Sequence, residues 1–253
     1  MSMPSIPAGN GKHPILFVTI SANDLKASMA FYSSVFKWQT HEVAPTVAGA
    51  ATPGGPNVAL RADTPPGFPS LIPFIGVEDI DATMTRVVDS GGSLERAPWP
   101  VPGAGMLARF MDPSGTIYGL TTGLPEAPLA RIEMPFGASP KPAPGVVCSL
   151  EMYAKNGEAA GRFFGDVFGW GSIDTMPSFR AFDPGAGICG VFQTHTSVTP
   201  AVGYIYSLDV KAALAEIENA GGKRLAEPMS APGMGTFGYF KDPSGSTMGL
   251  IGP

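Results

Sequence analysis

Glu151 is the side chain of this sequence that is best placed for acid–base chemistry. It lies in the middle of Cys148-Ser149-Leu150-Glu151-Met152-Tyr153, whose residue types predict a β-strand. Side chains alternate between the two faces of a strand, so Glu151 shares a face with Ser149 and Tyr153. If that face borders an apolar pocket, the carboxylate would have a raised pKa and could act as a general base or bind a ligand. The alternative is that Glu151 pairs with an arginine and holds two parts of the fold together.

Aromatic side chains form a second set of candidates, for binding rather than for proton transfer. Tyr204 and Tyr206 flank one residue of a predicted strand and therefore share a face, while Phe74 and Tyr239 belong to other predicted strands. Trp99 lies between two prolines in a predicted loop, where it could cover a ligand. These rings could form the walls of a site for a planar molecule, or they could fill a core.

Three arginines in predicted strands are candidates for binding an anion. Arg61, Arg109 and Arg180 stand where Thr or Val is more usual in a strand. Facing inward, each guanidinium could hold an anionic group. Facing outward, each would be solvated, which is the more usual position for an arginine in a half-exposed sheet.

The sequence offers few residues for a metal site. A site of two histidines and one carboxylate needs two of His13, His41 and His195 to converge, yet all three lie near predicted strand or helix edges. Cys148 and Cys189 are the two cysteines of the sequence, and no Cys-x-x-Cys motif is present. No nucleophile elbow, phosphate-binding loop or dinucleotide fingerprint follows a predicted strand. We therefore predict no metal and no other cofactor.

Composition sets the class of protein. The 253 residues, of which 44% are hydrophobic and 15% charged, suffice for one large or two small globular domains. The net charge of -5 argues against a nucleic-acid partner, because binding phosphates needs clustered Lys and Arg. The sequence has no apolar run of about 18 residues to span a membrane, and residues 1–12 lack the pattern of a signal peptide. We expect a cytoplasmic protein whose partner is a small molecule.

An internal repeat organises the chain. Asp112-Pro113-Ser114-Gly115 returns as Asp242-Pro243-Ser244-Gly245, and each copy is followed by three residues and Gly-Leu. Asp caps its own backbone, Pro fixes φ and Gly accepts a positive φ, so each copy predicts a tight turn between two strands. The chain is therefore one module built twice. Equivalent pairs elsewhere in the repeat include Phe31 and Phe163, Trp38 and Trp170, Phe74 and Tyr204, and Thr19 and Glu151.

Within each half, a strand, a helix and a set of further strands occur twice. In the first half, residues 14–20 predict a strand, and Asn23 or Asp24 caps a helix with an apolar face. Residues 71–77 predict a second strand, and the helix capped by Asp79 ends at a Gly-Gly pair. We predict an α+β fold of two tandem modules, each made of two such units. The predicted bounds are a tail at 1–12, module 1 at 13–122, a Pro- and Gly-rich linker at 123–145 and module 2 at 146–253.

Two helix ends carry an aromatic motif, Phe31-Tyr32-x3-Phe36-x-Trp38 in one half and Phe163-Phe164-x3-Phe168-Gly169-Trp170 in the other. With the Gly-Gly helix stops and the Asp-Pro-Ser-Gly turns, these motifs resemble the vicinal oxygen chelate superfamily. This is the group of glyoxalase I, bleomycin-resistance proteins and extradiol dioxygenases. The resemblance covers roughly residues 14–121 and 146–251. It implies four βαβββ units whose mixed sheets curl into cup-shaped pockets, which hold metal and substrate in that family.

The resemblance also identifies three positions per module from which metal-dependent members of that family take ligands. They are an inward residue early in the first strand, the start of the strand before the second helix, and the second-last residue of the strand after the Asp-Pro-x-Gly turn. The residues there are Phe17, Ile72 and Gly119 in module 1 and Ser149, Val202 and Gly249 in module 2. Phe, Ile, Val and Gly cannot coordinate a metal through a side chain, and Ser is a poor ligand. Because glyoxalase I and the extradiol dioxygenases need their metal, the resemblance argues against both reactions here.

Three hypotheses about function follow. The first is a metal-free relative of the bleomycin-resistance type that binds a small apolar or aromatic molecule in a sheet-lined cup, as a monomer or a homodimer. The second is a metal-independent lyase, isomerase or hydroxylase-like enzyme with Glu151 as its catalytic base. The third is a metal-dependent glyoxalase or dioxygenase, which requires ligands at other positions. The residues predicted to bind the ligand are Thr19, Phe74, Trp99, Arg109, Ser149, Tyr153, Tyr204, Tyr206 and Tyr239.

Overall fold

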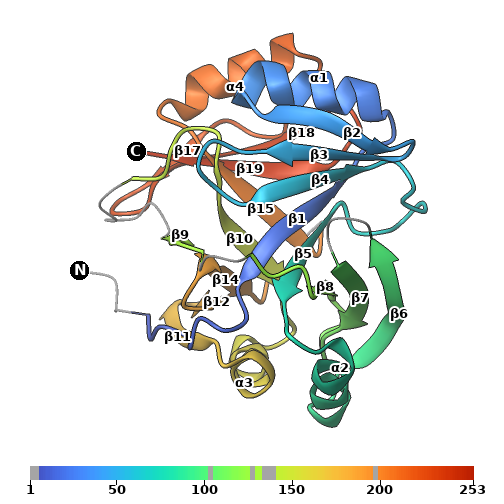
Figure 1. Ribbon diagram of the computed structural model, residues 1–253. Coiled ribbons are helices and arrows are strands. Elements are labelled where there is room, and N and C mark those ends of the chain that lie inside the picture. Colours follow the sequence, from blue (N-terminus) through green and yellow to red (C-terminus); the bar gives the residue numbers. More distant parts are fainter. Residues whose placement is uncertain (1–5, 102–104, 126–128, 133–140, 196–198) are drawn as a thin grey trace. The chain divides into compact units, whose positions relative to one another are not determined.

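A computed structural model describes residues 6–101, 105–125, 129–132, 141–195 and 199–253 of the chain. Over these residues a strand and a helix followed by further strands recur along the chain, as the sequence predicts (Figure 1). No helix within the described ranges is long and apolar enough to cross a membrane.

The two halves of the chain contain matching series of elements. The first half has β1 (Ile15–Ser21), α1 (Leu25–Phe36), β2 (Gln39–Ala44), β3 (Val47–Ala51), β4 (Asn57–Arg61), β5 (Leu71–Gly76), α2 (Ile80–Asp89), β6 (Ser93–Val101), β7 (Gly105–Met111), β8 (Ile117–Thr121) and β9 (Arg131–Ile132). The second half has β10 (Val147–Tyr153), α3 (Gly157–Phe168), β11 (Gly171–Met176), β12 (Phe179–Asp183), β13 (Gly187–Ile188), β14 (Gly190–Gln193), β15 (Ala201–Tyr206), α4 (Val210–Asn219), β16 (Lys223–Arg224), β17 (Met229–Ala231), β18 (Gly235–Lys241) and β19 (Thr247–Gly252).

Side-chain caps explain where these helices begin. Asp24, Asp79, Asn156 and Asp209 each accept a hydrogen bond from the backbone amide three residues ahead. The cap satisfies one of the amide groups that a helix leaves without an intrahelical partner, and so stabilises the first turn. Of the two caps predicted for α1, Asn23 and Asp24, the structure has Asp24.

The strands form two open, mixed sheets with matching strand orders. One order is β2-β3-β4-β1-β5-β8-β7-β6 and the other is β11-β12-β14-β10-β15-β19-β18-β16. In the first sheet β4 pairs parallel with β1 and β8 parallel with β5, whereas β2 with β3 and β7 with β8 pair antiparallel. The matching orders and the mixed pairing confirm the predicted α+β fold of two tandem modules. The residue bounds of the modules and of the linker stay a prediction.

The two Asp-Pro-Ser-Gly turns have the same hydrogen bonds. In each turn Oδ1 of the aspartate, Asp112 or Asp242, accepts from the backbone amides two and four residues ahead at 2.8 or 2.9 Å. Gly115 and Gly245 both have a φ of 88°, which glycine adopts without strain. The turn predicted from these residue types is therefore confirmed in both copies.

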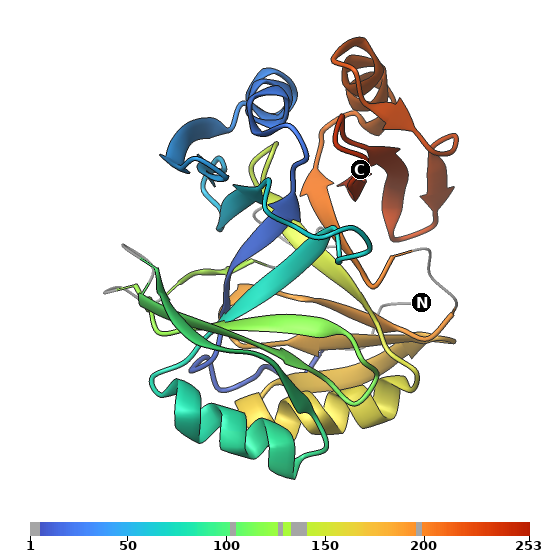
Figure 2. The same ribbon diagram turned by 90° about the vertical axis from the view of Figure 1, so that its right-hand side faces the viewer.

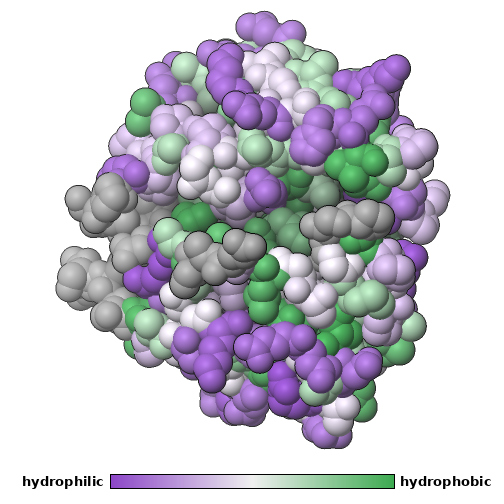
Figure 3. All heavy atoms as spheres, in the orientation of Figure 1, coloured by the Kyte–Doolittle hydropathy of each residue, from purple (hydrophilic) through white to green (hydrophobic). Residues whose placement is uncertain are grey.

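The chain divides into two compact units, and each unit takes segments from both halves of the sequence. Unit 1 comprises Met1–Leu16, Ile72–Arg131 and Glu151–Pro200, and unit 2 comprises Phe17–Leu71, Ile132–Leu150 and Ala201–Pro253. Unit 1 contains α2 and α3, which lie side by side (Figure 2). Unit 2 contains α1 and α4, which also contact each other and carry many hydrophilic side chains on the face seen in Figure 3.

Aromatic rings pack beneath the helices of each unit. In unit 1, Phe164 of α3 stacks with Trp170 at 4.8 Å between ring centroids. In unit 2, Tyr32 of α1 stacks with Trp38 at 4.5 Å. Burial of such large rings is a major favourable term in folding. The aromatic motifs at the two helix ends are therefore core residues in both copies of the repeat.

Trp99 lies in a strand, so the loop predicted from its neighbouring prolines is wrong. β6 is the last strand of its sheet and pairs antiparallel with β7, with Trp99 opposite Leu107. The register of this pair shifts between Leu94 and Arg96 and again between Arg96 and Trp99. An edge strand with bulges tolerates proline, because the missing amide has no partner strand to serve.

Candidate functional site

Aromatic and apolar side chains of unit 2 gather around one face of its strands. Tyr204 and Tyr206 share a face of β15, and Phe237 and Tyr239 share a face of β18, because side chains alternate along a strand. We call this group the tyrosine cluster. Its buried members are Val146, Cys148, Val202, Tyr204, Tyr206 and Ile251, and Ile132, Phe237 and Tyr239 pack against them.

Two phenol groups meet within the tyrosine cluster. The hydroxyl oxygens of Tyr204 and Tyr239 lie 2.7 Å apart, a hydrogen-bond distance, and their rings meet edge to face with centroids 5.9 Å apart. Phe237 meets the Tyr204 ring edge to face at 6.2 Å. Tyr204 is 5% exposed, whereas Phe237 and Tyr239 are partly exposed. The arrangement offers aromatic surface together with a hydroxyl pair, a combination that can hold a planar molecule with a polar group.

The tyrosine cluster has no charged member and no reactive thiol. None of its residues is Asp, Glu, Lys or Arg. The Cys148 thiol donates to the carbonyl oxygen of Tyr204 at 3.5 Å, and burial raises the pKa of Cys148 to about 12. The thiol is therefore protonated at neutral pH and is a weak nucleophile. An ionised group packed among these hydrophobic side chains alone would lack a partner of opposite charge, which is costly.

A glycine occupies the third position of each module at which the resemblance implies a metal ligand, and an aromatic ring covers it. Gly249 of β19 pairs with Tyr204 of β15 on one side and with Tyr239 of β18 on the other. A Cβ atom added to Gly249 would lie 2.5 Å from the Tyr204 ring, and one added to Gly119 would lie 2.3 Å from the Phe74 ring. Both distances are below 3.0 Å, a separation that Cβ atoms essentially never show in proteins. The glutamate that the resemblance implies has no room at either position unless the ring moves.

The other positions implied by the resemblance hold no suitable donor either. Phe17, Ile72 and Val202 are hydrocarbon side chains, and Ser149 is a buried hydroxyl. Among the residues that the structure describes, no group of three or more His, Cys, Asp or Glu could hold a metal ion. The residues present therefore do not fit the metal of this family, and the metal-free state itself stays a prediction.

The equivalent strands of unit 1 carry an ion pair in place of the phenol pair. Arg109 of β7, the repeat equivalent of Tyr239, donates to Glu95 of β6 from Nε at 2.5 Å and from Nη2 at 3.2 Å. The guanidinium carbons of Arg96 and Arg109 lie 3.9 and 5.6 Å from the centroid of the Trp99 ring. Arg109 is 8% exposed, so the solvated outer position does not apply to it. Glu95 was not predicted, because the proline-containing strand that carries it reads as a loop.

The remaining predicted residues lie outside the tyrosine cluster. Glu151 is partly buried in β10, where alternation puts it on the same face as Ser149 and Tyr153. Thr19, its repeat equivalent, is buried in β1, and Phe74 is buried in β5. The ligand-binding roles of these residues and the catalytic role of Glu151 stay predictions.

The other two arginine candidates are bound to aspartates. Arg61 pairs with Asp63 at 2.8 Å in unit 2, and Arg180 pairs with Asp174 at 2.9 Å in unit 1. Both arginine side chains are largely buried, whereas their aspartate partners are more exposed. These pairs suit a structural role better than the binding of a free anion, because the guanidinium charge is already compensated.

A comparison with known families matches the first half of the chain. Residues 15–117 match the family model described as Glyoxalase/Bleomycin resistance protein/Dioxygenase superfamily. This part of the chain is therefore similar in sequence to that superfamily. The resemblance predicted from the sequence motifs is thereby confirmed, and the superfamily fold here carries a tyrosine cluster with a covered glycine at a metal-ligand position.

Similar proteins extend the match over nearly the whole chain. "Putative glyoxylase CFP32" of Mycobacterium tuberculosis is 27% identical over 254 residues, covering 94% of either chain. The anthracycline biosynthesis protein DauV of a Streptomyces species is 26% identical over 258 residues, covering 92% of this chain and 90% of its own. The crystal structure of the Mn(II)-bound glyoxalase from Novosphingobium aromaticivorans has a TM-score of 0.64 at 19% identity, covering 97% of this chain and 83% of its own. At 19% sequence identity, the similarity to this structure is evidence for a shared fold and for nothing more.

Proposed function

We propose that this protein binds a small, uncharged aromatic molecule at the tyrosine cluster and does so without a metal. The observation that carries the proposal is the ring over each glycine of the third metal-ligand position, Tyr204 over Gly249 and Phe74 over Gly119. Where a metal-dependent relative would present a carboxylate, this chain presents the face or edge of a ring. Such a ring can stack with a ligand ring but cannot hold a metal ion as a carboxylate does.

The chemistry of the tyrosine cluster narrows the class of ligand. Its apolar members favour an uncharged molecule, since a buried charge without a partner is costly. The hydroxyl groups of Tyr204 and Tyr239 can each donate and accept. A planar molecule with a carbonyl or hydroxyl group should therefore bind more tightly than a plain hydrocarbon of the same size.

The relatives suggest a first compound to try. DauV is named for anthracycline biosynthesis, and anthracyclines are fused-ring aromatic molecules with several carbonyl and hydroxyl groups. The uncharged anthracycline aglycone, without the basic amino sugar, therefore matches both the aromatic and the hydrogen-bonding features of the proposed site. A flat hydrocarbon of similar ring count, without oxygen substituents, is the matched comparison compound.

Native mass spectrometry of the untagged protein, with elemental analysis of the same sample, tests the metal-free part of the proposal. We expect no stoichiometric divalent metal and a mass that rises by one ligand when the anthracycline is added. A stoichiometric metal would contradict the proposal and would restore the metal-dependent chemistry of the superfamily.

Titration of tyrosine variants tests the position of the site. Tyr204→Phe and Tyr239→Phe each remove one hydroxyl of the pair and keep the ring. We expect each to weaken anthracycline binding by about tenfold, the usual effect of losing a hydrogen bond within an apolar site. Tyr118→Phe is the matched control, because Tyr118 is a buried tyrosine of unit 1. Equal losses in all three variants would place the ligand elsewhere.

A further inference from the structure

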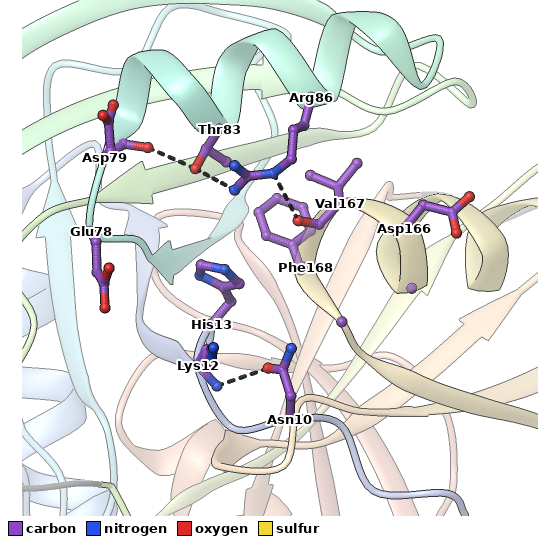
Figure 4. A pocket seen from close by; sticks show the side chains of 12 residues that line it. Asn10, Lys12, His13, Glu78, Asp79, Thr83, Arg86, Asp166, Val167 and Phe168 are labelled. Atoms are coloured by element: carbon purple, nitrogen blue, oxygen red, sulfur yellow. Dashed lines mark hydrogen bonds between the residues drawn. The ribbon is translucent and has the colours of Figure 1, made fainter.

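A pocket of about 390 Å³ lies in unit 1 where three segments meet. These segments are the start of α2, the end of α3 and the residues that lead into β1. Val167 and Phe168, at the end of α3, are buried and add an apolar part to the lining. A volume of this order suits a small molecule. The charged or titratable residues of the lining include Lys12, His13, Glu78, Asp79 and Arg86 (Figure 4).

His13 is a neutral hydrogen-bonding group inside this pocket. Its Nδ1 lies 3.1 Å from the carbonyl oxygen of Gly76, and a carbonyl can only accept, so Nδ1 carries the hydrogen. The lone pair of Nε2 is then left as an acceptor. The ring packs edge to face on Phe168 with centroids 5.9 Å apart. Burial lowers the pKa of His13, which keeps the imidazole uncharged at neutral pH.

Charges of both signs surround His13. The Arg86 guanidinium is fixed by hydrogen bonds from Nε to the carbonyl oxygen of Val167 at 3.4 Å and from Nη2 to Thr83 Oγ1 at 2.9 Å. A guanidinium has five N–H groups, so this anchoring leaves donors for a ligand. In Figure 4 the Glu78 carboxylate lies on a different side of the His13 ring from Arg86. The pocket can therefore contact a negative group of a small molecule through Arg86 and a positive group of the same molecule through Glu78.

The second copy of the internal repeat carries different side chains at the equivalent positions. The indole of Trp170 donates to the backbone carbonyl of His13 at 2.8 Å, and the indole of Trp38 donates in the same way to Gly145 at 2.7 Å. The position that accepts the indole bond thus holds histidine in one copy of the repeat and glycine in the other. The repeat equivalents of Glu78 and Arg86 are Leu208 and Glu216, which carry no matching charge. The imidazole and its two oppositely charged neighbours belong to one copy of the repeat only.

We propose that this pocket binds a small zwitterion of the amino-acid class, with its carboxylate toward Arg86 and its ammonium group toward Glu78 and His13. A dianion such as phosphate would be repelled by Glu78 and Asp79. A simple amine would be repelled by Lys12 and Arg86. A molecule that carries both charges avoids both penalties. The pocket shares no residue with the tyrosine cluster. The test of this proposal therefore does not depend on whether the proposed function is right.

Nuclear magnetic resonance of the histidine rings tests this proposal directly. The sequence has three histidines, and His13→Ala identifies the His13 signals. The probes are glycine and alanine, with acetate and methylammonium at equal ionic strength as single-charge comparisons. We expect the amino acids to shift the His13 signals saturably and to leave those of His41 and His195 unchanged. Acetate and methylammonium should bind at least about tenfold more weakly, since each forms only part of the charge-assisted contacts.

Two glutamate variants separate a built site from a general charge effect. Glu78→Gln should weaken alanine binding by about tenfold and leave acetate binding equal or stronger. Glu216→Gln, at the repeat equivalent of Arg86 on α4, should change neither. Both positions are exposed, so both variants should keep the far-ultraviolet circular dichroism and thermal midpoint of the parent. The proposal fails if acetate shifts His13 as strongly as alanine does, if Glu78→Gln leaves alanine binding unchanged, or if no probe gives a saturable shift.

Discussion

At the scale of single residues, Gly249 and Gly119 decide what the strand after each Asp-Pro-Ser-Gly turn can do. Neither has a positive φ, so their backbone conformation does not itself require glycine. What requires glycine is the ring that lies over each Cα, 2.5 Å from an added Cβ at Gly249 and 2.3 Å at Gly119. A carboxylate side chain at either position and the ring that lies over it therefore exclude each other.

Gly249→Ala tests this link. The added methyl group would overlap the Tyr204 ring, so the ring or the strand must shift. We expect the free energy of unfolding to fall by about 1–3 kcal/mol, the usual cost of overpacking a core, measured by urea denaturation. Gly165→Ala in α3 is the matched control, because its added Cβ would meet only the Trp170 carbonyl at an ordinary 3.5 Å. In a Tyr204→Ala background the penalty of Gly249→Ala should vanish; a penalty that persists would mean that the ring is not its cause.

The variant Glu151→Gln distinguishes a binding protein from an enzyme. If the proposed function is right, Glu151→Gln, which keeps the size of the side chain but removes its charge and its basicity, leaves anthracycline affinity unchanged. Neither the parent nor the variant should convert the compound, as judged by mass spectrometry of the ligand after long incubation. Conversion by the parent that is lost in the variant would instead support a metal-independent enzyme with Glu151 as its base.

At the scale of elements, the Asp-Pro-Ser-Gly turns bury a carboxylate that is costly to ionise. Asp112 is 4% exposed, and burial raises the pKa of Asp112 from 3.8 to about 6. In the described part of the chain, its Oδ2 has no hydrogen-bond partner. In unit 2 the equivalent oxygen of Asp242 accepts from the Tyr32 hydroxyl at 3.0 Å, and burial likewise raises the pKa of Asp242 to about 6. Both folded-state pKa values exceed the unfolded value of 3.8. Between about pH 4 and pH 6 the folded protein therefore binds more protons than the unfolded protein does.

The pH dependence of stability follows from that difference. The contribution of each aspartate is fully present below about pH 4 and is lost as the pH rises through about 6, on the order of 3 kcal/mol per group. Asp112→Asn removes one of the two titrations and keeps Oδ1 for the turn amides. We expect the fall in unfolding free energy between pH 4 and 6 to be about half as steep in this variant, measured by urea denaturation. Asp89→Asn, at an exposed position, should keep the parent slope; an equal slope in Asp112→Asn would show that this carboxyl does not titrate there.

The elements that the sequence predicts correctly are those with local signals. Asp24 and Asp79 cap helices because a short acceptor side chain reaches the next turn, and the Asp-Pro-Ser-Gly turns need only four residues. Alternation likewise puts Tyr204 and Tyr206 on one face. β6 was missed because prolines mark it as a loop, whereas pairing with β7 and bulges at a sheet edge make it a strand. The partners of Arg109 and Tyr239 could not be predicted, because they depend on strand register, which no short pattern encodes.

At the scale of the whole molecule, the repeat is visible in the sequence but the way its parts combine is not. Each compact unit joins segments from both halves of the chain. In unit 2, Tyr32 of α1 donates to Asp242, and in unit 1 Thr116 Oγ1 donates to the carbonyl oxygen of Tyr153 at 3.0 Å. Both contacts join a residue of the first half of the chain to one of the second half. Because both modules carry nearly the same local signals, their sequences alone do not say which quarter packs with which.

The shared units make a prediction about folding. Residues 1–132 and 141–253, produced as separate chains, each lack part of both compact units. We expect neither chain alone to show a cooperative unfolding transition as a monomer, because buried groups such as Asp242 lose their partners. Mixing the two should restore the transition and give a complex of one copy each, followed by calorimetry and size-exclusion chromatography. Cooperative monomeric folding of either fragment would contradict the division into mixed units. A fragment that folds only as a homodimer would show that a second copy of one module can replace the other, which the similar strand orders of the two sheets make physically reasonable.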